Sequence, residues 1–379
     1  MANFEDPAEA LAGARLTIDL AALRANYVLI AERAAPARAA AVVKADAYGL
    51  GAERVVRTLA EAGCRDFFVA VIIEALALVR HAPGDARIYV LNGLPPGAEA
   101  VCAGAGVVPV LNSLAQVERW RAEAKRRRVR LACVLQVDSG MSRLGLAARD
   151  IDQLPPGLTD EVEVVLVLSH LACGDTPGAT ANQEQLARFE ALADRIGPVL
   201  PRSLANSAGV FIGPEFQQDL VRPGLALYGA APIEGAASPV RPVVRLEARV
   251  IQLRSVDAGA GVGYGLTYVA REPRRLATVS VGYADGWPRR LGGRAAAYFG
   301  DVRLPIVGRV SMDSMTLDVS DLPCGTLAEG DFVELIGPHQ TLEAVAAGAD
   351  TIAYEILTGL GKRYSRTYLT QDACVEIDA

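Results

Sequence analysis

The chain has 379 residues, and about half of them (51%) are apolar, which suffices for two or three domains with at least one large core. Its formal net charge of −6 gives no basis for binding nucleic acid or an anionic membrane. The six cysteines are widely separated and the three histidines lack metal-ligand spacing, so we predict reduced thiols and no metal site.

The N-terminal segment shows no targeting signal. Its first fifteen residues contain Glu5, Asp6 and Glu9 and lack the apolar core of a signal peptide. No apolar run in the chain approaches the length that a membrane-spanning helix needs. We therefore predict a cytoplasmic protein with no membrane partner.

Short apolar runs alternate with stretches of helical spacing over the first 239 residues. The candidate strands are residues 40–45, 67–72, 87–92, 107–112, 131–138, 163–169, 203–206 and 220–228. Helical spacing is strongest at residues 52–62 and 181–196. Eight units with nearly continuous apolar strands predict a parallel sheet that is covered on both faces, an α/β fold of the (β/α)8 TIM barrel type.

The pattern changes near residue 240. Apolar and charged residues alternate from Val244 to Val250, as in a half-buried strand, and further short strands are predicted at residues 276–281, 302–310, 315–319 and 332–336. One helical stretch, residues 341–358, interrupts them. The barrel is therefore followed by a mainly β C-terminal domain, residues 240–379.

Lys44 lies at the carboxyl end of the first predicted strand. An isolated ammonium group is disfavoured among hydrocarbon neighbours, so a lysine in this place has a lowered pKa or a covalent use such as a Schiff base. The ordinary alternative is a strand-end lysine whose amine reaches water. Taken alone, Lys44 favours that alternative.

Polar side chains also follow other predicted strands at the same end of the barrel, where the active sites of such barrels lie. They are Asp138, Arg143, His170, Asn206 and Ser207, joined by Arg222 within the last predicted strand. Singly, Asn206 and Ser207 could cap a helix and His170 could be a core histidine. Their convergence on one end of the barrel predicts an active site that includes Lys44.

Nine sequence blocks, in order along essentially the whole chain, resemble alanine racemases. They are AVVKADAYGLG (41–51), VDSGMSRLGL (137–146), SHLACGD (169–175), SLANSAG (203–209), VRPGLALYG (221–229), VGYG (262–265), VGYADGWPRRL (281–291), VGRVSMDSM (307–315) and TIAYEILTGLGKRY (351–364). The resemblance implies an isomerase that interconverts L-alanine and D-alanine with pyridoxal 5′-phosphate (PLP) as cofactor.

The resemblance also implies residue roles. Lys44 would hold PLP covalently and act as one catalytic base, and Tyr264 would be the base on the opposite face of the substrate. The other cofactor-binding residues would be Tyr48, Arg143, His170, Asn206, Ser207, Arg222, Gly224, Leu225 and Tyr354. Arg143, Met312 and Asp313 would bind the substrate, and Tyr283 and Arg290 would flank the entrance, although Tyr283 could simply pack in a strand.

Two bases suit the reaction, because racemisation removes a proton from one face of the α-carbon and returns one to the other. Lysine and tyrosine titrate near pH 10 in water, so nearby arginines would be needed to make them effective bases at neutral pH. The family is a head-to-tail homodimer with shared active sites, in which Tyr264, Met312 and Asp313 enter the partner's barrel. Dimerisation is implied here by resemblance alone.

Gln136 departs from the pattern of many family members, which have a carbamylated lysine that holds the arginine corresponding to Arg143. Glutamine is neutral and carries no carbamate, so Arg143 loses an anionic neighbour unless chloride or another carboxylate supplies one. We expect activity to survive this change.

Other readings fit the sequence less well. A decarboxylase of the barrel-plus-β type is disfavoured by the Arg222-Pro-Gly block, and a PLP homeostasis protein would lack both the second domain and Tyr264. Serine is the nearest competing substrate: Tyr354 and Met312 would favour a methyl side chain, but such a pocket rejects a small added hydroxyl only modestly. The sequence leaves open whether D-alanine is made for peptidoglycan or degraded for carbon.

Overall fold

The computed structural model describes residues 11–370 and 376–377. Most of the N-terminal segment in which no signal peptide is predicted, residues 1–15, lies outside the described residues. The chain forms two compact units, Leu23–Arg241 and Met1–Ala22 together with Pro242–Ala379. The division predicted at residue 240 stays a prediction. No helix among the described residues has the length and apolar character to cross a membrane.

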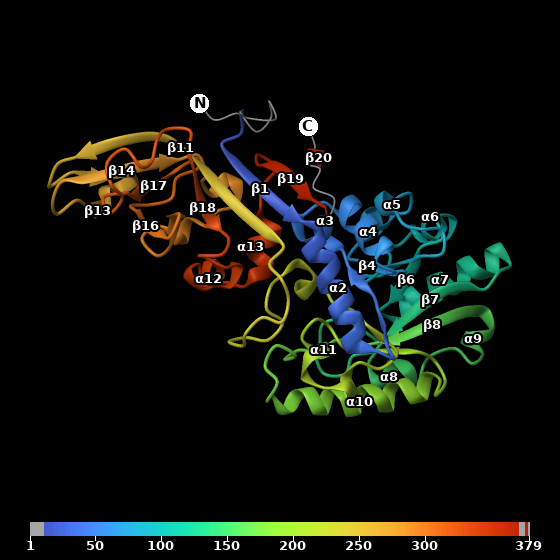
Figure 1. Cartoon of the computed structure of the whole chain (residues 1–379). Coiled ribbons are helices and arrows are strands. Elements are labelled where there is room, and N and C mark those ends of the chain that lie inside the picture. Colours follow the sequence, from blue (N-terminus) through green and yellow to red (C-terminus); the bar gives the residue numbers. More distant parts are fainter. Residues whose placement is uncertain (1–10, 371–375, 378–379) are drawn as a thin grey trace. The chain divides into compact units, whose positions relative to one another are not determined.

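The Leu23–Arg241 unit is built of parallel strands that alternate with helices along the chain (Figure 1). In chain order they are β2 (Arg38–Ala39), β3 (Ala41–Val42), β4 (Asp66–Val69), β5 (Arg87–Val90), β6 (Val108–Leu111), β7 (Leu131–Gln136), β8 (Val162–Leu168), β9 (Arg202–Ser203) and β10 (Leu220–Val221). Strands β3 to β9 form one sheet, and β10 pairs with β2. The amide of Arg222 donates to the carbonyl of Ala205 at 2.9 Å, which closes the strands into a ring between β9 and β10.

Helices follow the strands of this unit. They are α2 (Leu20–Ala34), α3 (Lys44–Gly49), α4 (Ala52–Glu61), α5 (Ile72–Leu78), α6 (Glu99–Gly104), α7 (Leu114–Arg127), α8 (Ala148–Ile151), α9 (Leu158–Glu161), α10 (Thr180–Ile196) and α11 (Gly209–Ile212), with 3-10 turns at Pro214–Phe216 and Leu225–Tyr228. Helix α4 shows why they pack: Val55, Val56 and Leu59 recur at helical spacing and are buried. The predicted barrel is confirmed.

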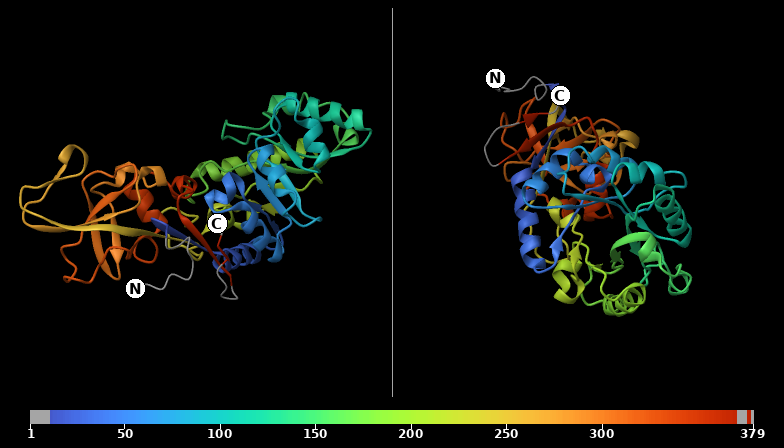
Figure 2. Two further views of the ribbon diagram at one scale, coloured as in Figure 1. Left: turned by 90° about the horizontal axis from the view of Figure 1, so that it is seen from above. Right: turned by 90° about the vertical axis from the view of Figure 1, so that its right-hand side faces the viewer.

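The other unit is mainly antiparallel. It contains β1 (Ala14–Asp19), β11 (Val244–Val256), β12 (Gly261–Val262), β13 (Tyr268–Val269), β14 (Arg274–Val279), β15 (Ala296–Phe299), β16 (Val302–Val307), β17 (Met315–Asp318), β18 (Phe332–Ile336), β19 (Ser365–Leu369) and β20 (Glu376–Ile377). The long strand β11, yellow in Figure 2, pairs with β18 through its first part and with β14 through its second. The predicted β domain is confirmed.

Two local predictions differ from the structure. The helical stretch at residues 341–358 is two helices, α12 (Leu342–Gly348) and α13 (Ala353–Gly359), because Asp350 between them has a left-handed backbone with φ of 52°. No strand was predicted at the N-terminus, yet β1 pairs with β11 and β19. Its alternation of buried and half-buried residues is the signal that could have revealed it.

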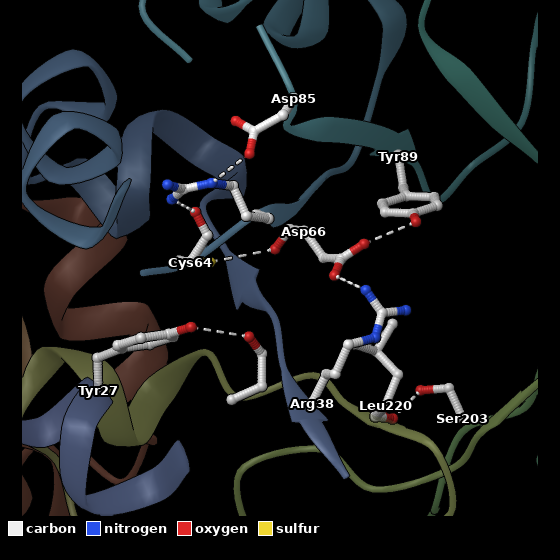
Figure 3. A network of polar contacts seen from close by, with 10 residues as sticks. Tyr27, Arg38, Cys64, Asp66, Asp85, Tyr89, Ser203 and Leu220 are labelled. Carbon is white, nitrogen blue, oxygen red and sulfur yellow. Dashed lines mark hydrogen bonds and ion pairs between the residues drawn. The ribbon is translucent and has the colours of Figure 1, made fainter. Parts of the chain in front are cut away.

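A polar network lies at the amino-terminal ends of the barrel strands (Figure 3). This end of the barrel is opposite to the carboxyl ends, where the predicted active-site residues lie. The buried carboxylate of Asp66 accepts hydrogen bonds from Arg38 at 2.5 Å and from the Tyr89 hydroxyl at 2.8 Å. The Cys64 thiol donates to the Asp66 carbonyl at 3.4 Å, and burial raises its pKa to about 12. In barrels of this type the active site lies at the carboxyl ends of the strands, so this network contributes to stability.

We expect Asp66→Asn to lower the free energy of unfolding by about 1–3 kcal/mol, because a buried acceptor shared by two donors is replaced by a group that can accept from only one side. The measurement is urea unfolding. Asp85→Asn is the matched control, since Asp85 pairs with Arg65 at the exposed surface and its loss should cost no more than about 0.5 kcal/mol. Equal effects of the two variants would contradict this prediction.

Candidate active site

Lys44 begins α3, two residues beyond the carboxyl end of β3, and is partly buried. Burial lowers its pKa, the Arg143 guanidinium lowers it further, and the Glu74 carboxylate raises it. Both causes of the lowering disfavour the ammonium form. Lys44 is therefore readier to act as a free amine than a lysine in water.

Arg143 lies in the loop after β7, whose shape is fixed by backbone contacts. One oxygen of the Asp138 carboxylate accepts from the amides of Gly140, Met141 and Ser142 at 2.9–3.0 Å. The loop then returns to its start, because the Asp138 amide donates to the carbonyl of Leu146 at 3.0 Å. Asp138 thus shapes the loop that carries Arg143, a structural role that the sequence did not predict.

Gln136 is buried at the end of β7, and its side-chain amide donates to the carbonyl of Leu144 at 3.4 Å. It therefore contacts the backbone next to Arg143. Among the described residues, no carboxylate forms an ion pair with Arg143 within 4.0 Å. The effect of the neutral Gln136 on Arg143 stays a prediction.

Arg222 follows β10 and is buried, with its guanidinium held by neutral groups. It donates to the Ser203 hydroxyl at 2.5 Å and to the Ser169 carbonyl at 2.6 Å, and it lies 3.5 Å from Nδ1 of His170. Burial lowers the pKa of Arg222 to about 10. Burial, followed by the charges of Arg222, Arg143 and Lys44, lowers the pKa of His170 to about 3, so His170 is neutral at physiological pH.

A close-packed turn follows Arg222. The Ser207 hydroxyl accepts from the amides of Gly224 at 2.9 Å and Ala226 at 3.2 Å. A Cβ at position 224 would lie 2.3 Å from the Tyr48 hydroxyl, so only glycine allows Tyr48 to approach this turn. The ring of Tyr48 in turn packs on that of Tyr228, with centroids 4.6 Å apart.

The structure thus brings together most of the barrel residues that the sequence singled out: Lys44, Arg143, His170 and Arg222 in one group of charges, and Tyr48, Ser207, Gly224 and Leu225 around one turn. Asn206 has the ordinary role that the sequence left open, because its side-chain oxygen accepts from the Gly209 amide at the start of α11 at 2.9 Å. Its assignment to the cofactor stays a prediction.

The remaining predicted residues belong to the mainly β unit. Tyr264 lies in a short 3-10 turn (Tyr264–Leu266) between two glycines with positive φ, and its side chain is 70% exposed. Met312 is 53% exposed and Asp313 is exposed as well. The role of these three residues at the active site stays a prediction.

A network behind Asp313 was missed by the sequence analysis. Arg363 donates to one oxygen of Asp313 at 2.7 Å and grips the buried carboxylate of Asp285 through two hydrogen bonds of 2.6 and 2.8 Å. Asp285 also accepts from the Gly282 amide at 2.9 Å, and the Ala284 amide donates to the carbonyl of Met312 at 2.9 Å. One network therefore orders the segments that carry Met312 and Asp313.

The residues assigned to the entrance, Tyr283 and Arg290, and the predicted cofactor residue Tyr354 also lie in the mainly β unit. Tyr283 is 42% exposed in the turn Tyr283–Asp285, so it does not simply pack in a strand. Arg290 forms an ion pair with Asp350. Tyr354 lies on α13 and is partly exposed.

Comparisons with known proteins agree over both units. Residues 18–232 match the family model of the alanine racemase N-terminal domain, and residues 243–368 match that of the C-terminal domain. The chain is 56% identical to "Alanine racemase" of Brucella canis over 380 residues, which covers 96% of each chain. It is 53% identical to "Alanine racemase, catabolic" of Agrobacterium fabrum over 360 residues, which covers 94% of this chain and 92% of the relative.

Solved structures give the same result. A crystal structure of alanine racemase from Bartonella henselae with covalently bound pyridoxal phosphate superimposes with a TM-score of 0.91 at 46% identity, covering 94% of this chain and all of that one. The biosynthetic alanine racemase from Pseudomonas aeruginosa has a TM-score of 0.86 at 37% identity, covering 95% and 100%.

The fold and the lysine site define a two-domain enzyme of the barrel-plus-β class. Within that class, the chain belongs to the alanine racemase family, and the enzyme is an isomerase. The resemblance stated from the sequence is confirmed.

Proposed function

We propose that this enzyme interconverts L-alanine and D-alanine with PLP held on Lys44. The observation that carries the proposal is the cluster at the carboxyl ends of the barrel strands, where Lys44 has a lowered pKa beside Arg143, His170 and Arg222. The names of the relatives support the substrate, and the PLP bound covalently in the Bartonella henselae enzyme supports the cofactor.

The residues of the barrel unit fit PLP. Close packing of Tyr48 against the Gly224 turn, beside the Ser207 hydroxyl, brings hydroxyl and amide groups to one place, the chemistry that binds a phosphate. Arg222, which is buried and has no carboxylate partner among its described hydrogen bonds, would face the pyridine nitrogen. Its pKa of about 10 keeps it charged and makes it a poor proton donor at neutral pH.

When bound, PLP supplies electron withdrawal that makes the α-proton of an attached amino acid acidic. The protein must then move that proton. Lys44 would take or return it on one face of the α-carbon, Tyr264 on the other, and Arg143 would bind the substrate carboxylate, with Met312 and Asp313 lining the pocket. Arginine is suited to the carboxylate because its planar fork donates two parallel hydrogen bonds.

The shared-site homodimer is part of the proposal. The exposed Tyr264 and Met312 support it, because large side chains of this kind are typical of surfaces that meet another chain. We further propose a cytoplasmic enzyme that acts on some serine. Relatives are named both as biosynthetic and as catabolic, so both uses of D-alanine stay candidates.

The test is a chiral assay of the purified enzyme with L-alanine, followed by borohydride reduction and peptide mapping. We expect a racemic end point and a reduced cofactor adduct on the peptide that contains Lys44. No racemisation in the presence of added PLP, or an adduct on another lysine, would contradict the proposal.

Gln136→Lys tests whether the neutral side chain at position 136 weakens the binding of alanine through Arg143. A lysine here would be buried beside Arg143, and only its carbamate would attract that arginine. We expect the KM for alanine to fall about tenfold when bicarbonate is added to this variant, because a hydrogen bond to a charged group contributes roughly 1.5 kcal/mol or more. The wild type and the exposed control Gln153→Lys should not respond. A variant whose KM ignores bicarbonate would contradict this role.

A further inference from the structure

The backbone that follows Lys44 is left-handed over four consecutive residues, none of which is glycine. Their φ angles are 53° for Ala45, 54° for Asp46, 53° for Ala47 and 58° for Tyr48, with ψ between 35° and 52°. L-residues disfavour this conformation, and it persists only where surrounding contacts hold it. Because Lys44 and Tyr48 border the turn, whatever holds it also sets the positions of both side chains.

Glu74 provides such a contact from the next unit of the barrel. One oxygen of its carboxylate accepts from the Ala45 amide at 2.7 Å. The other accepts from the amides of Ala70 at 2.8 Å and Val71 at 3.3 Å, which caps α5 at its start. One carboxylate oxygen of Glu74 therefore caps its own helix, and the other binds the residue next to Lys44.

Gln116 occupies the same position, the third residue of its helix, two units further along the barrel. Its side-chain oxygen caps α7 by accepting from the Asn112 amide at 2.7 Å, while its side-chain nitrogen donates to the Asn92 carbonyl in the preceding loop at 3.5 Å. A glutamine thus caps a helix and bridges to a carbonyl. At position 74 the preceding loop presents an N–H group instead, and only a carboxylate can accept from both sides.

We propose that Glu74 is a positioning residue for Lys44, which clamps the left-handed turn through the Ala45 amide and so holds the lysine amine in its reactive place. This inference rests on the proposed role of Lys44. The inference also explains why an acidic side chain lies close to Lys44, although Lys44 must lose its proton to act as a base. Only a carboxylate offers the two acceptor oxygens that the Ala45 amide and the start of α5 require. The negative charge of Glu74 is the cost, because it raises the pKa of Lys44.

Glu74→Gln separates the two tasks. Its oxygen can still cap α5, as in Gln116, but its NH2 group would face the Ala45 amide, donor against donor. We expect kcat for alanine to fall about tenfold with little change in KM, and hydrogen–deuterium exchange in the peptide spanning residues 43–52 of the holoenzyme to rise about tenfold. The acid limb of the pH profile of kcat should move to lower pH, because Lys44 keeps the positive Arg143 and neutral His170 as neighbours and loses the negative Glu74.

Glu74→Asp is the second variant. It keeps the charge and a helix-capping carboxylate but is too short to serve both sides, so exchange in residues 43–52 should rise while the acid limb stays in place. Gln116→Ala is the matched control, which loses a cap and a bridge in another unit, and it should change neither kcat nor exchange in residues 43–52.

Two results would overturn the inference: wild-type exchange of residues 43–52 in both Glu74 variants, or a loss of kcat in Gln116→Ala as large as in Glu74→Gln. Failure of the proposed function is distinguishable, because it would show in the wild type as an adduct on a lysine other than Lys44.

Discussion

Replacement of Lys44 by methionine is expected to abolish alanine racemisation, lowering kcat by roughly 10⁴-fold or more. The substitution removes both the amine that would hold the cofactor and one of the two proposed bases. Methionine fills a similar volume without a charge, so the partly buried position should tolerate it and the folded protein should survive. The chiral assay measures the loss, and absorbance after gel filtration measures how much cofactor stays bound.

Lys125→Met is the control for removing a lysine. Lys125 lies near the end of α7, where its amine forms an ion pair with Glu161 at 2.9 Å and is largely exposed. We expect wild-type activity and cofactor content from this variant. Residual racemisation by Lys44→Met within about tenfold of the wild type would show that another group does the work of Lys44.

Tyr264→Phe is expected to lower racemisation by about 10²- to 10⁴-fold, the usual contribution of one general acid or base. Because the side chain of Tyr264 is 70% exposed on its own unit, loss of the hydroxyl should not change stability. The two-base mechanism also predicts asymmetry. In deuterium oxide, the variant should exchange the α-proton of one enantiomer through Lys44 while interconversion of the two enantiomers is blocked.

Tyr268→Phe is the matched control, since Tyr268 lies four residues away in β13 and packs against the cluster of Val262, Leu276 and Val307. It should keep normal kcat. Equal exchange of both enantiomers by Tyr264→Phe, or an unchanged rate of racemisation, would rule out Tyr264 as the second base.

The sequence was sufficient for the parts of the molecule whose periodicity is local. The strands of the barrel were predicted because burial on both faces of a parallel sheet requires a continuous run of apolar residues. Helix α4 was predicted because its buried residues recur at helical spacing. Strand β1 was missed although Ala14, Leu16 and Ile18 alternate with more polar residues, because this alternation spans only six residues. The break at Asp350 was missed because neither its neighbours nor their spacing signals a left-handed residue.

The candidate site divides in the same way. Lys44, Arg143 and His170 could be predicted because each lies at or just after the end of a predicted strand, and parallel strands end at one edge. Arg222 was predicted from its place in the last predicted strand. Asp138 was predicted as a site residue, but its contacts with the loop amides were not, and the pairing of Asp285 with Arg363 joins two sequence blocks in a way that only the structure shows. Glu74 lies outside those blocks and was missed. For Glu74, an acidic third residue in the helix after a strand was a signal of a cap, but the second acceptor role depends on the turn at Ala45.

The amino-acid order by itself determined the eight-unit barrel, the following β domain and the family, since these depend on the composition and spacing of short segments. Only the tertiary structure decided how the reactive lysine is held. Glu74 and Ser207 accept hydrogen bonds from distant backbone amides only when the loops are already in place. A left-handed turn of non-glycine residues is stable only in such surroundings. Contacts of this kind have no periodicity along the chain.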